Sequence, residues 1–380
     1  MDNKYYSFAG IYIFTYGAIG TLFPLIGQYL ASIGFSGVQI GLVTATATAV
    51  GIGASPFWGY RSHHSKDSTH VVIALCIIAS LVIAGLAFAK SYPVFLIGYA
   101  IFFFFQAPVM PLTDAMTLEN RIHFGSVRKW GALSYAAAVF VAGQLAHIKG
   151  MVIILPLCAS CYTIAWIIML RLKRRGMRGE HGSEPVKKEH RNYLVLLKNR
   201  KLMALLFAAF FVLGTNVANN TYFSFLYKDV GGTIAGVGVA FLLMCAAEAP
   251  FMAWTGKLEK LLGMEKMILA SMIISALRFF WYSTGPSPAL LIGTFFLQGM
   301  VNGILLVEFI RYVAKLVEPA VIGMAMSLYQ AFASSSSAIL CQLAGGVILD
   351  RYGGPSVYLF FSIYNIIGII LYVGFGLYRR

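Results

Sequence analysis

Charged residues are scarce in this chain of 380 residues, where they make up 11% of the composition against 59% for hydrophobic residues. The mean hydropathy is +0.77. A chain with so much apolar surface cannot bury it in a water-soluble core. The composition therefore excludes a soluble globular protein and predicts a protein embedded in a lipid bilayer.

Motifs for enzymatic chemistry and for cofactors are also missing. The sequence contains no G-x-x-x-x-G-K-[ST] phosphate loop, so we do not expect ATP to drive the protein directly. It contains no metal-ligand spacing and no nucleophile motif, so we expect no cofactor and disfavour an enzyme. No histidine lies at mid-membrane, because all seven fall in predicted loops or at helix ends: His63, His64, His70, His123, His147, His181 and His190.

The five cysteines are scattered through apolar segments, which argues against disulfide bonds. Cys158 and Cys161 form a C-x-x-C within LPLCASCYTIAW. Such a pair can be redox-active in a soluble fold, but in the middle of an apolar segment small packing residues are the favoured interpretation.

Long apolar runs are what the chain has in abundance, and twelve of them approach the ~20 residues that a membrane-spanning helix needs. The runs predict an all-α membrane protein with twelve transmembrane helices in two six-helix bundles, the first starting near the N-terminus as a span rather than a cleaved signal. The first six spans are expected at about 7–30, 38–60, 70–90, 93–117, 127–147 and 151–171, and the second six at about 203–227, 233–255, 266–284, 287–311, 319–348 and 355–378.

The positions of the basic residues predict how the chain is oriented in the membrane. The polar stretch 172–201 is a predicted linker, and residues 171–201 carry eleven Lys or Arg, which places the linker in the cytoplasm by the positive-inside rule. With both termini also cytoplasmic, all but five of the 29 basic residues lie on the inner side or in the linker; the others are Lys90, Lys149, Lys228, Arg351 and the intramembrane Arg278. The net charge of +15 is thus a topology signal and predicts no nucleic-acid partner.

The two sets of six spans suggest an internal duplication, with an N-terminal bundle at 1–171 and a C-terminal bundle at 202–380. Secondary transporters built in this way hold substrate between two halves that move in alternation.

The stretch 108–130 places a carboxylate, Asp114, before a short loop and a cation, Arg128, after it. Charges at membrane depth are costly and are kept when they face a polar path or a partner. Tyr135 shares a helical face with Arg128. The pattern is compatible with a cross-helix ion pair or with a substrate clamp, and alternatively with Arg128 extending to lipid head groups.

The second half has its own polar groups inside predicted spans. Glu248 and Arg278 have no nearby partner in sequence, and a relation between them, direct or through substrate, is our hypothesis alongside a purely structural bridge. Glu308 and Arg311 are three residues apart, which favours a structural pair. If protons are carried, the carrier must be Asp114, Glu248 or Glu308.

Amide and hydroxyl side chains complete the set of polar groups. They can bind a polar solute or join helices. Gln298 and Asn302 share one helical face, as do Asn216, Asn219 and Asn220, whereas we interpret the serine run 334–337 as a packing surface.

These residues resemble the major facilitator superfamily, and PLTDAMTLENRIHFGSVRKWGALSYA is similar to its lactose-permease-like branch, especially phenylpropionate permeases and nucleoside–proton symporters. The likeness includes GFSGVQIG, AEAPF, ALRFFWY, LQGMVNG and GGVILDRYGG. It implies that Asp114 and Arg128 bind substrate and that Tyr135 replaces a stacking tryptophan. It also implies that Arg278 matches an arginine of the proton machinery and that Glu248 falls about one turn from a functional acid.

Three positions depart from the family pattern. Gln298 stands where the branch has a histidine, and Val301 where lactose permeases have the coupling glutamate, which disfavours lactose transport by that relay. His63 replaces the usual aspartate of the first cytoplasmic loop.

We therefore expect a monomeric secondary transporter of a bacterial-type inner membrane. It would carry a small polar organic solute, a sugar, nucleoside or aromatic carboxylate, together with protons, and Na⁺ in place of protons stays open. The substrate-binding residues would be Asp114, Arg128, Tyr135, Asn219, Gln298 and Asn302, and the coupling residues Glu248 and Arg278. The alternative is a proton-driven exporter of amphipathic compounds.

Overall fold

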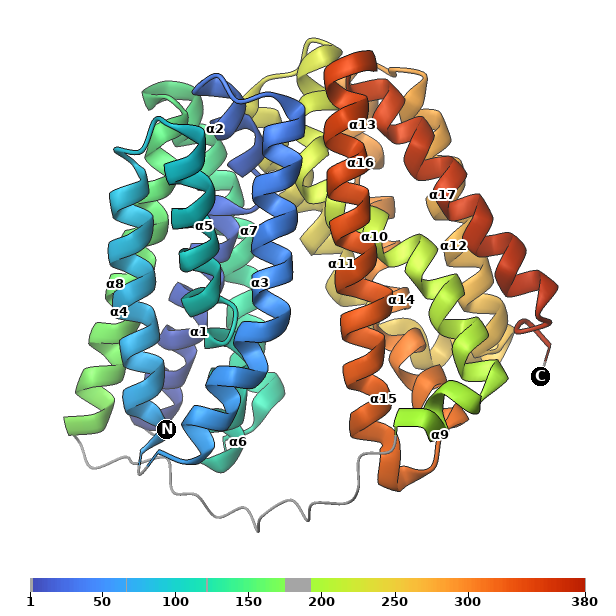
Figure 1. Cartoon of the computed structure of the whole chain (residues 1–380), viewed down its shortest axis with the longest axis horizontal. Coiled ribbons are helices and arrows are strands. Elements are labelled where there is room, and N and C mark those ends of the chain that lie inside the picture. The colour runs from blue at the N-terminus through green and yellow to red at the C-terminus, as the bar shows by residue number, and fades with distance from the viewer. Residues whose placement is uncertain (1–2, 66, 121, 175–192, 380) are drawn as a thin grey trace. The chain divides into compact units, whose positions relative to one another are not determined.

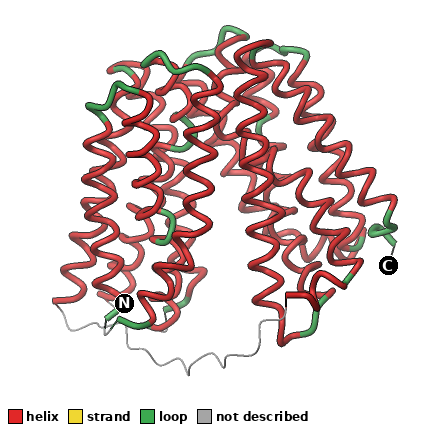
Figure 2. The backbone as a smooth tube through the Cα atoms, in the orientation of Figure 1, coloured by secondary structure: helices red, strands yellow, loops and turns green. Residues whose placement is uncertain are grey.

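The structure, a computed structural model, describes residues 3–65, 67–120, 122–174 and 193–379. These residues form helices joined by short loops, with no strand among them (Figure 2). The all-α fold is confirmed. Most of the predicted linker, residues 175–192, lies outside the described residues.

The described chain divides into two compact units, of which the first comprises 1–35 and 42–186. Within it, α1 packs against α7 and α8, and α4 packs against α5 and α8 (Figure 1). Asp67 begins α4 by accepting a hydrogen bond from the amide N–H of Thr69, a cap that satisfies one of the free donors of a helix start. The helices of this unit are α1 (Asn3–Leu22), α2 (Ile26–Ser32), α3 (Gly37–His63, whose residues 37–41 belong to the second unit), α4 (Ser68–Leu86), α5 (Tyr92–Gln106), α6 (Val109–Glu119), α7 (Phe124–Lys149), η1 (Met151–Ile153) and α8 (Ile154–Arg174).

The second unit comprises 36–41 and 187–380. Its first segment is the start of α3, where the amide N–H groups of Gly37 and Val38 donate to the Asp350 carboxylate. The two sequence motifs GFSGVQIG and GGVILDRYGG are therefore in contact. The helices of this unit are α9 (Tyr193–Lys198), α10 (Arg200–Asp229), α11 (Ile234–Leu262), α12 (Met264–Ser283), α13 (Pro288–Thr294), α14 (Phe296–Leu316), η2 (Pro319–Val321), α15 (Ile322–Leu328), η3 (Tyr329–Ser336), α16 (Ser337–Tyr352) and α17 (Gly354–Gly374).

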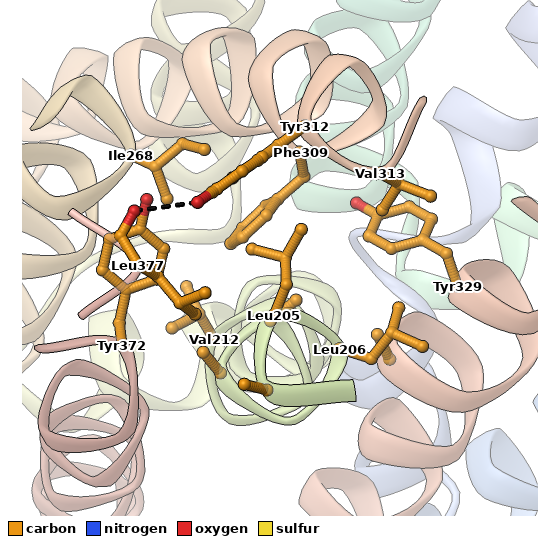
Figure 3. Close-up of a cluster of buried hydrophobic side chains, with 14 of the residues drawn as sticks. Leu205, Leu206, Val212, Ile268, Phe309, Tyr312, Val313, Tyr329, Tyr372 and Leu377 are labelled. Carbon is orange, nitrogen blue, oxygen red and sulfur yellow. Dashed lines mark hydrogen bonds between the residues drawn. The ribbon is translucent and has the colours of Figure 1, made fainter. Parts of the chain in front are cut away.

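Helix α10 is central to the second unit and packs against α14, α16, α17 and η3. Figure 3 shows Leu205 and Val212 of this helix among aromatic and aliphatic side chains from α12, α14 and α17. The Tyr312 hydroxyl, which this apolar cluster buries, donates to the Leu377 carbonyl over 2.9 Å. Burial of apolar side chains around α10 holds the helices that carry the polar groups of this unit.

Ten helices of the described chain are long and apolar enough to cross a membrane, or eleven if the bent pair α1–α2 forms one span. That pair corresponds to the first predicted span and is bent by 43° at residues 23–25. The remaining predicted span is α12, whose twenty residues include Glu265, Lys266 and Arg278. Span 11 is interrupted by η3, an eight-residue π-helical segment. Such segments are rare and occur frequently at functional sites.

Candidate functional site

In the first unit, the Arg128 guanidinium donates to one oxygen of the Asp114 carboxylate over 3.0 Å. The Tyr12 hydroxyl donates to the other oxygen over 2.6 Å. Tyr12 is fully buried on α1 and also lies 3.2 Å from the Thr117 hydroxyl. Of the alternatives that the sequence left open, the structure shows the cross-helix ion pair, and Arg128 is not simply directed to lipid.

Two features of the sequence place this pair. A break at Pro108 ends α5 and starts α6, so Asp114 lies in the middle of a short helix. Helix α7 begins after His123, which puts Arg128 in its second turn and over the Phe124 ring, 5.1 Å from the ring centre. The side chains of Arg128 and Asp114 are 47% and 24% exposed, so the pair remains accessible to a polar solute.

Tyr135 is half-buried two turns along α7 from Arg128. Glycines let α1 and α7 approach closely here: a methyl group added at Gly20 would lie 2.6 Å from the Tyr135 carbonyl oxygen, and one at Gly131 would meet the Tyr16 ring. The backbone around Tyr135 is therefore fixed by direct helix-to-helix contact.

The second unit contains a cavity of about 250 Å³. Its polar lining consists of amides, hydroxyls and one carboxylate, with no cation among the lining residues. The lining side chains come from α10, α11, α14 and η3: Leu213, Asn216, Val217, Asn220, Glu248, Asn302, Leu305, Leu306, Ile310, Tyr329, Gln330 and Ser334.

Gln298 is hydrogen-bonded to two of the amide side chains that line the cavity. Its side-chain N–H₂ group donates to the Asn216 side-chain oxygen over 3.1 Å and to the Asn302 side-chain oxygen over 2.9 Å. Gln298 is itself fully buried and is not among the lining residues. It therefore positions Asn216 and Asn302 rather than facing the cavity.

Glu248 is half-buried on α11 and faces the same cavity. No ion pair involves it in the part of the chain that the structure describes. Its position depends on a close approach of α11 and α14, where Gly299 packs against the Met244 carbonyl and Gly303 against the Glu248 carbonyl. A methyl group at Gly303 would lie 2.7 Å from the Glu248 carbonyl oxygen. Gly299 and Gly303 form a G-x-x-x-G, a spacing known to bring membrane helices together.

The hypothesis of a direct Glu248–Arg278 pair is wrong. Arg278 is 3% exposed and lies on α12, where no described residue forms an ion pair with it. Asn219 is also outside the cavity: it is fully buried and accepts a hydrogen bond from the Tyr358 hydroxyl over 2.7 Å. Asn220, the next residue on α10, takes its place in the lining.

The Glu308–Arg311 pair is confirmed, with 3.3 Å between the two charged groups. Arg311 also contacts Glu259 over 2.7 Å, so these charges join α11 and α14. The interpretation of the serine run 334–337 is half right. Ser337 packs α16 onto α10 through a bond to the Phe210 carbonyl, whereas Ser334 lines the cavity.

Two structural features of this region were missed from the sequence. The spacing of Gly299 and Gly303 was a readable signal for the α11–α14 contact. The π-helical segment, which brings Tyr329, Gln330 and Ser334 to the cavity, has no comparable sequence signature. The described residues contain no group of three or more His, Cys, Asp or Glu side chains placed to hold a metal ion.

Comparison with known proteins agrees with this architecture. The chain is 32% identical to maltose permease of Geobacillus stearothermophilus, over 95% of this chain and 91% of that protein. It is 28% identical to the uncharacterized transporter YwbF of Bacillus subtilis (strain 168), over 99% and 92%. A solved structure of a mutant of the nucleoside transporter NupG superposes with a TM-score of 0.90 at 15% identity, covering 98% of this chain and all of that one, which shows the fold alone.

The family profile described as "MFS_1 like family" matches residues 5–360. The relatives are transporters and permeases rather than enzymes, and the described helices have the length and composition of membrane spans. The chain belongs to the MFS_1 like family and is a multi-pass membrane transporter of the major facilitator superfamily.

Proposed function

We propose that this transporter carries a neutral, hydroxyl-rich solute, a sugar of the maltose class, together with a proton. The observation that carries the proposal is the lining of the cavity in the second unit. Amides and hydroxyls can donate to and accept from sugar hydroxyls, and a single carboxylate adds a strong acceptor. An aromatic carboxylate would need a free cation, which the lining of this cavity does not supply, and the Arg128 guanidinium of the first unit is already paired with Asp114.

The relative named maltose permease supports the same substrate class, because it is 32% identical over nearly the whole chain. The likeness to NupG does not favour a nucleoside, since at 15% identity it speaks only for the fold. We assign Asn216, Asn220 and Asn302 to hydrogen bonds with sugar hydroxyls, and Gln298 to the positioning of Asn216 and Asn302.

In the first unit, Asp114, Arg128 and Tyr135 supply a second set of sugar-binding groups. Asp114 and Arg128 are partly exposed, so a sugar hydroxyl can donate to the carboxylate and accept from the guanidinium. Tyr135 offers the aromatic surface on which the apolar face of a sugar ring packs.

Glu248 is the proton carrier in this proposal. It is the only ionisable carboxylate in the lining of the cavity, it is half-buried, and no cation of the described chain pairs with it. A carboxylate at membrane depth without a cation is most stable when it carries a proton. Release of that proton after the sugar binds would couple proton movement to sugar movement.

The test uses purified protein in de-energised vesicles with a pH-sensitive dye in the external medium. Adding maltose is expected to make the medium more alkaline, as protons enter with sugar, while nucleosides and phenylpropionate give no signal. Glu248→Gln should abolish the proton signal and keep maltose exchange. Glu259→Gln, on the same helix but paired with Arg311, is the matched control and should keep both.

A proton signal with phenylpropionate alone would overturn the sugar assignment. Maltose uptake with an unchanged proton signal in Glu248→Gln would remove that residue from coupling, and uptake that follows Na⁺ would replace the proton. Efflux of amphipathic dyes without maltose flux would favour an exporter.

We also propose that the protein lies in a bacterial-type inner membrane as a monomer, with both termini and the 172–201 linker in the cytoplasm. The basic residues concentrated in and around that linker support this orientation. Cysteines introduced near either terminus should react with a membrane-impermeant reagent only after the cells are opened. Labelling of intact cells at those sites would reverse the topology.

A further inference from the structure

Arg278 is a buried cation whose charge nothing in the described chain neutralises. Its side chain is 3% exposed, and none of its three guanidinium nitrogens has a hydrogen-bond partner there. Every nitrogen of a guanidinium is a donor and none can accept. A buried charge without a partner is strongly unfavourable, so this group calls for an acceptor.

The surroundings of Arg278 hold further donors without acceptors. The Tyr282 hydroxyl, one helical turn along α12, lies close to the Arg278 guanidinium and to the Thr294 hydroxyl without a well-formed hydrogen bond to either. The side-chain N–H₂ group of Asn219 on α10 has no hydrogen-bond partner among the described residues. The oxygen of Asn219 is already used, because it accepts from the Tyr358 hydroxyl of α17. The free groups of this cluster, Arg278, Tyr282 and Asn219, are thus all able to donate.

Aromatic rings pack against the Arg278 guanidinium. The guanidinium carbon lies 4.4 Å from the centre of the Phe279 ring and 5.5 Å from that of Tyr282. The Tyr358 ring packs against both rings, with centre-to-centre distances of 5.7 and 5.6 Å. Ring faces attract a cation, but they do not accept the in-plane N–H bonds of a guanidinium. The cage therefore lowers the cost of the charge without providing the acceptor.

Six carboxylates that the structure describes in the second unit lie at other sites, and the seventh, Glu318, is exposed in the loop after α14. Arg311 pairs with both Glu308 and Glu259, Lys315 pairs with Glu265, and Glu248 faces the sugar cavity, whose lining includes neither Arg278 nor Asn219. Asp229 and Asp350 accept from backbone amides of Gly354 and Gly37. No carboxylate of the described residues therefore neutralises Arg278, and an anion from outside the chain can supply the missing acceptor.

We propose that this cluster, between α10, α12 and α17, is a binding site for a small monovalent anion such as chloride. A halide accepts from several donors at once without a preferred orientation, which suits the guanidinium and the tyrosine hydroxyl of α12 together with the amide of α10. The anion neutralises Arg278 and joins α12 to α10 through its contacts. The site is separate from the sugar cavity.

The test is thermal unfolding of the purified, detergent-solubilised protein without sugar, as potassium gluconate is replaced by potassium chloride at constant ionic strength. A ligand that binds only the folded state stabilises it with a saturable dependence on concentration. We expect chloride and bromide to raise the melting temperature saturably. Gluconate, a much larger anion than chloride, is the reference anion.

Variants assign the effect to the cluster. Tyr282→Phe keeps the ring and removes the hydroxyl, so chloride binding should weaken by about tenfold, the usual effect of losing a hydrogen bond to a charged group. Tyr227→Phe, a buried tyrosine of the same unit, is the matched control and should keep the chloride response. Arg278→Gln should abolish it, with Arg200→Gln, an exposed cation on α10, as the second control.

Equal melting temperatures in chloride and gluconate for the unaltered protein would overturn the proposal and leave the aromatic cage as the sole support of Arg278. A chloride response that persists in Tyr282→Phe and Arg278→Gln would place the anion elsewhere. Because these measurements contain no sugar and no proton gradient, they stand or fall independently of the proposed transport activity.

Discussion

Arg128 and Tyr12 each hold one of the two oxygens of the Asp114 carboxylate, over 3.0 and 2.6 Å. Helices α1, α6 and α7 are thereby joined at one carboxylate. The pair is partly exposed, and an exposed ion pair contributes about 1 kcal/mol or less to stability. A large effect of changing it would therefore report on transport rather than on folding.

Asp114→Asn and Arg128→Gln should each reduce maltose uptake by more than about tenfold, because each removes one of the two charged groups assigned to the sugar. Each should lower the free energy of unfolding by only about 1 kcal/mol. Uptake and thermal unfolding are measured on the same preparations. Uptake close to that of the unaltered protein in both variants would make the pair purely structural.

Gly299→Ala and Gly303→Ala should push α14 away from α11, because the added methyl groups would collide with the carbonyls of Met244 and Glu248. Overpacking of this kind costs about 1–3 kcal/mol, and maltose uptake should fall with it. Gly293→Ala in α13 is the matched control, since nothing lies within 4 Å of the position its methyl group would take. Equal melting temperatures for all three variants would contradict the close contact.

Gln298→Leu keeps the approximate volume of the side chain and removes both hydrogen bonds that position Asn216 and Asn302. Leaving buried polar groups without partners costs about 1–3 kcal/mol each. Because Gln298 does not line the cavity, the variant should raise the KM for maltose more than it lowers the maximal rate. A change confined to the maximal rate would argue against this positioning role.

Ser334→Val should weaken sugar binding, since it replaces a hydroxyl of the cavity lining by an apolar group. Losing one neutral hydrogen bond of about 1 kcal/mol predicts a rise in KM of roughly fivefold. Ser327→Val, at an exposed position of α15, should leave the KM unchanged. The opposite ranking of the two variants would remove Ser334 from the site.

Much of the fold followed from the sequence, because apolar runs of spanning length and the distribution of basic residues are direct consequences of the bilayer. Contacts between residues close in sequence could also be predicted. Glu308 and Arg311 are one helical turn apart, and a short loop leaves little choice for Asp114 and Arg128.

The rotation of each membrane helix about its own axis could not be predicted from the sequence. Residues 216, 219 and 220 all lie on one broad face of α10, yet Asn220 lines the cavity and Asn219 bonds to Tyr358. In a span that is apolar nearly all round, the hydrophobic pattern does not say which edge of that face meets which neighbour. The same uncertainty produced the wrong Glu248–Arg278 pair, because the sequence places both residues in spans but not toward one another.

The π-helical segment η3 changes how the two parts of span 11, α15 and α16, are rotated relative to one another. In a π-helix each backbone N–H donates to the carbonyl five residues before it, so this segment accommodates one residue more than α-helical winding does. The side chains of α15 are therefore out of phase with those of α16. Tightening η3 into α-helical winding would turn Ile322–Leu328 about its own axis relative to Ser337, which is hydrogen-bonded to α10.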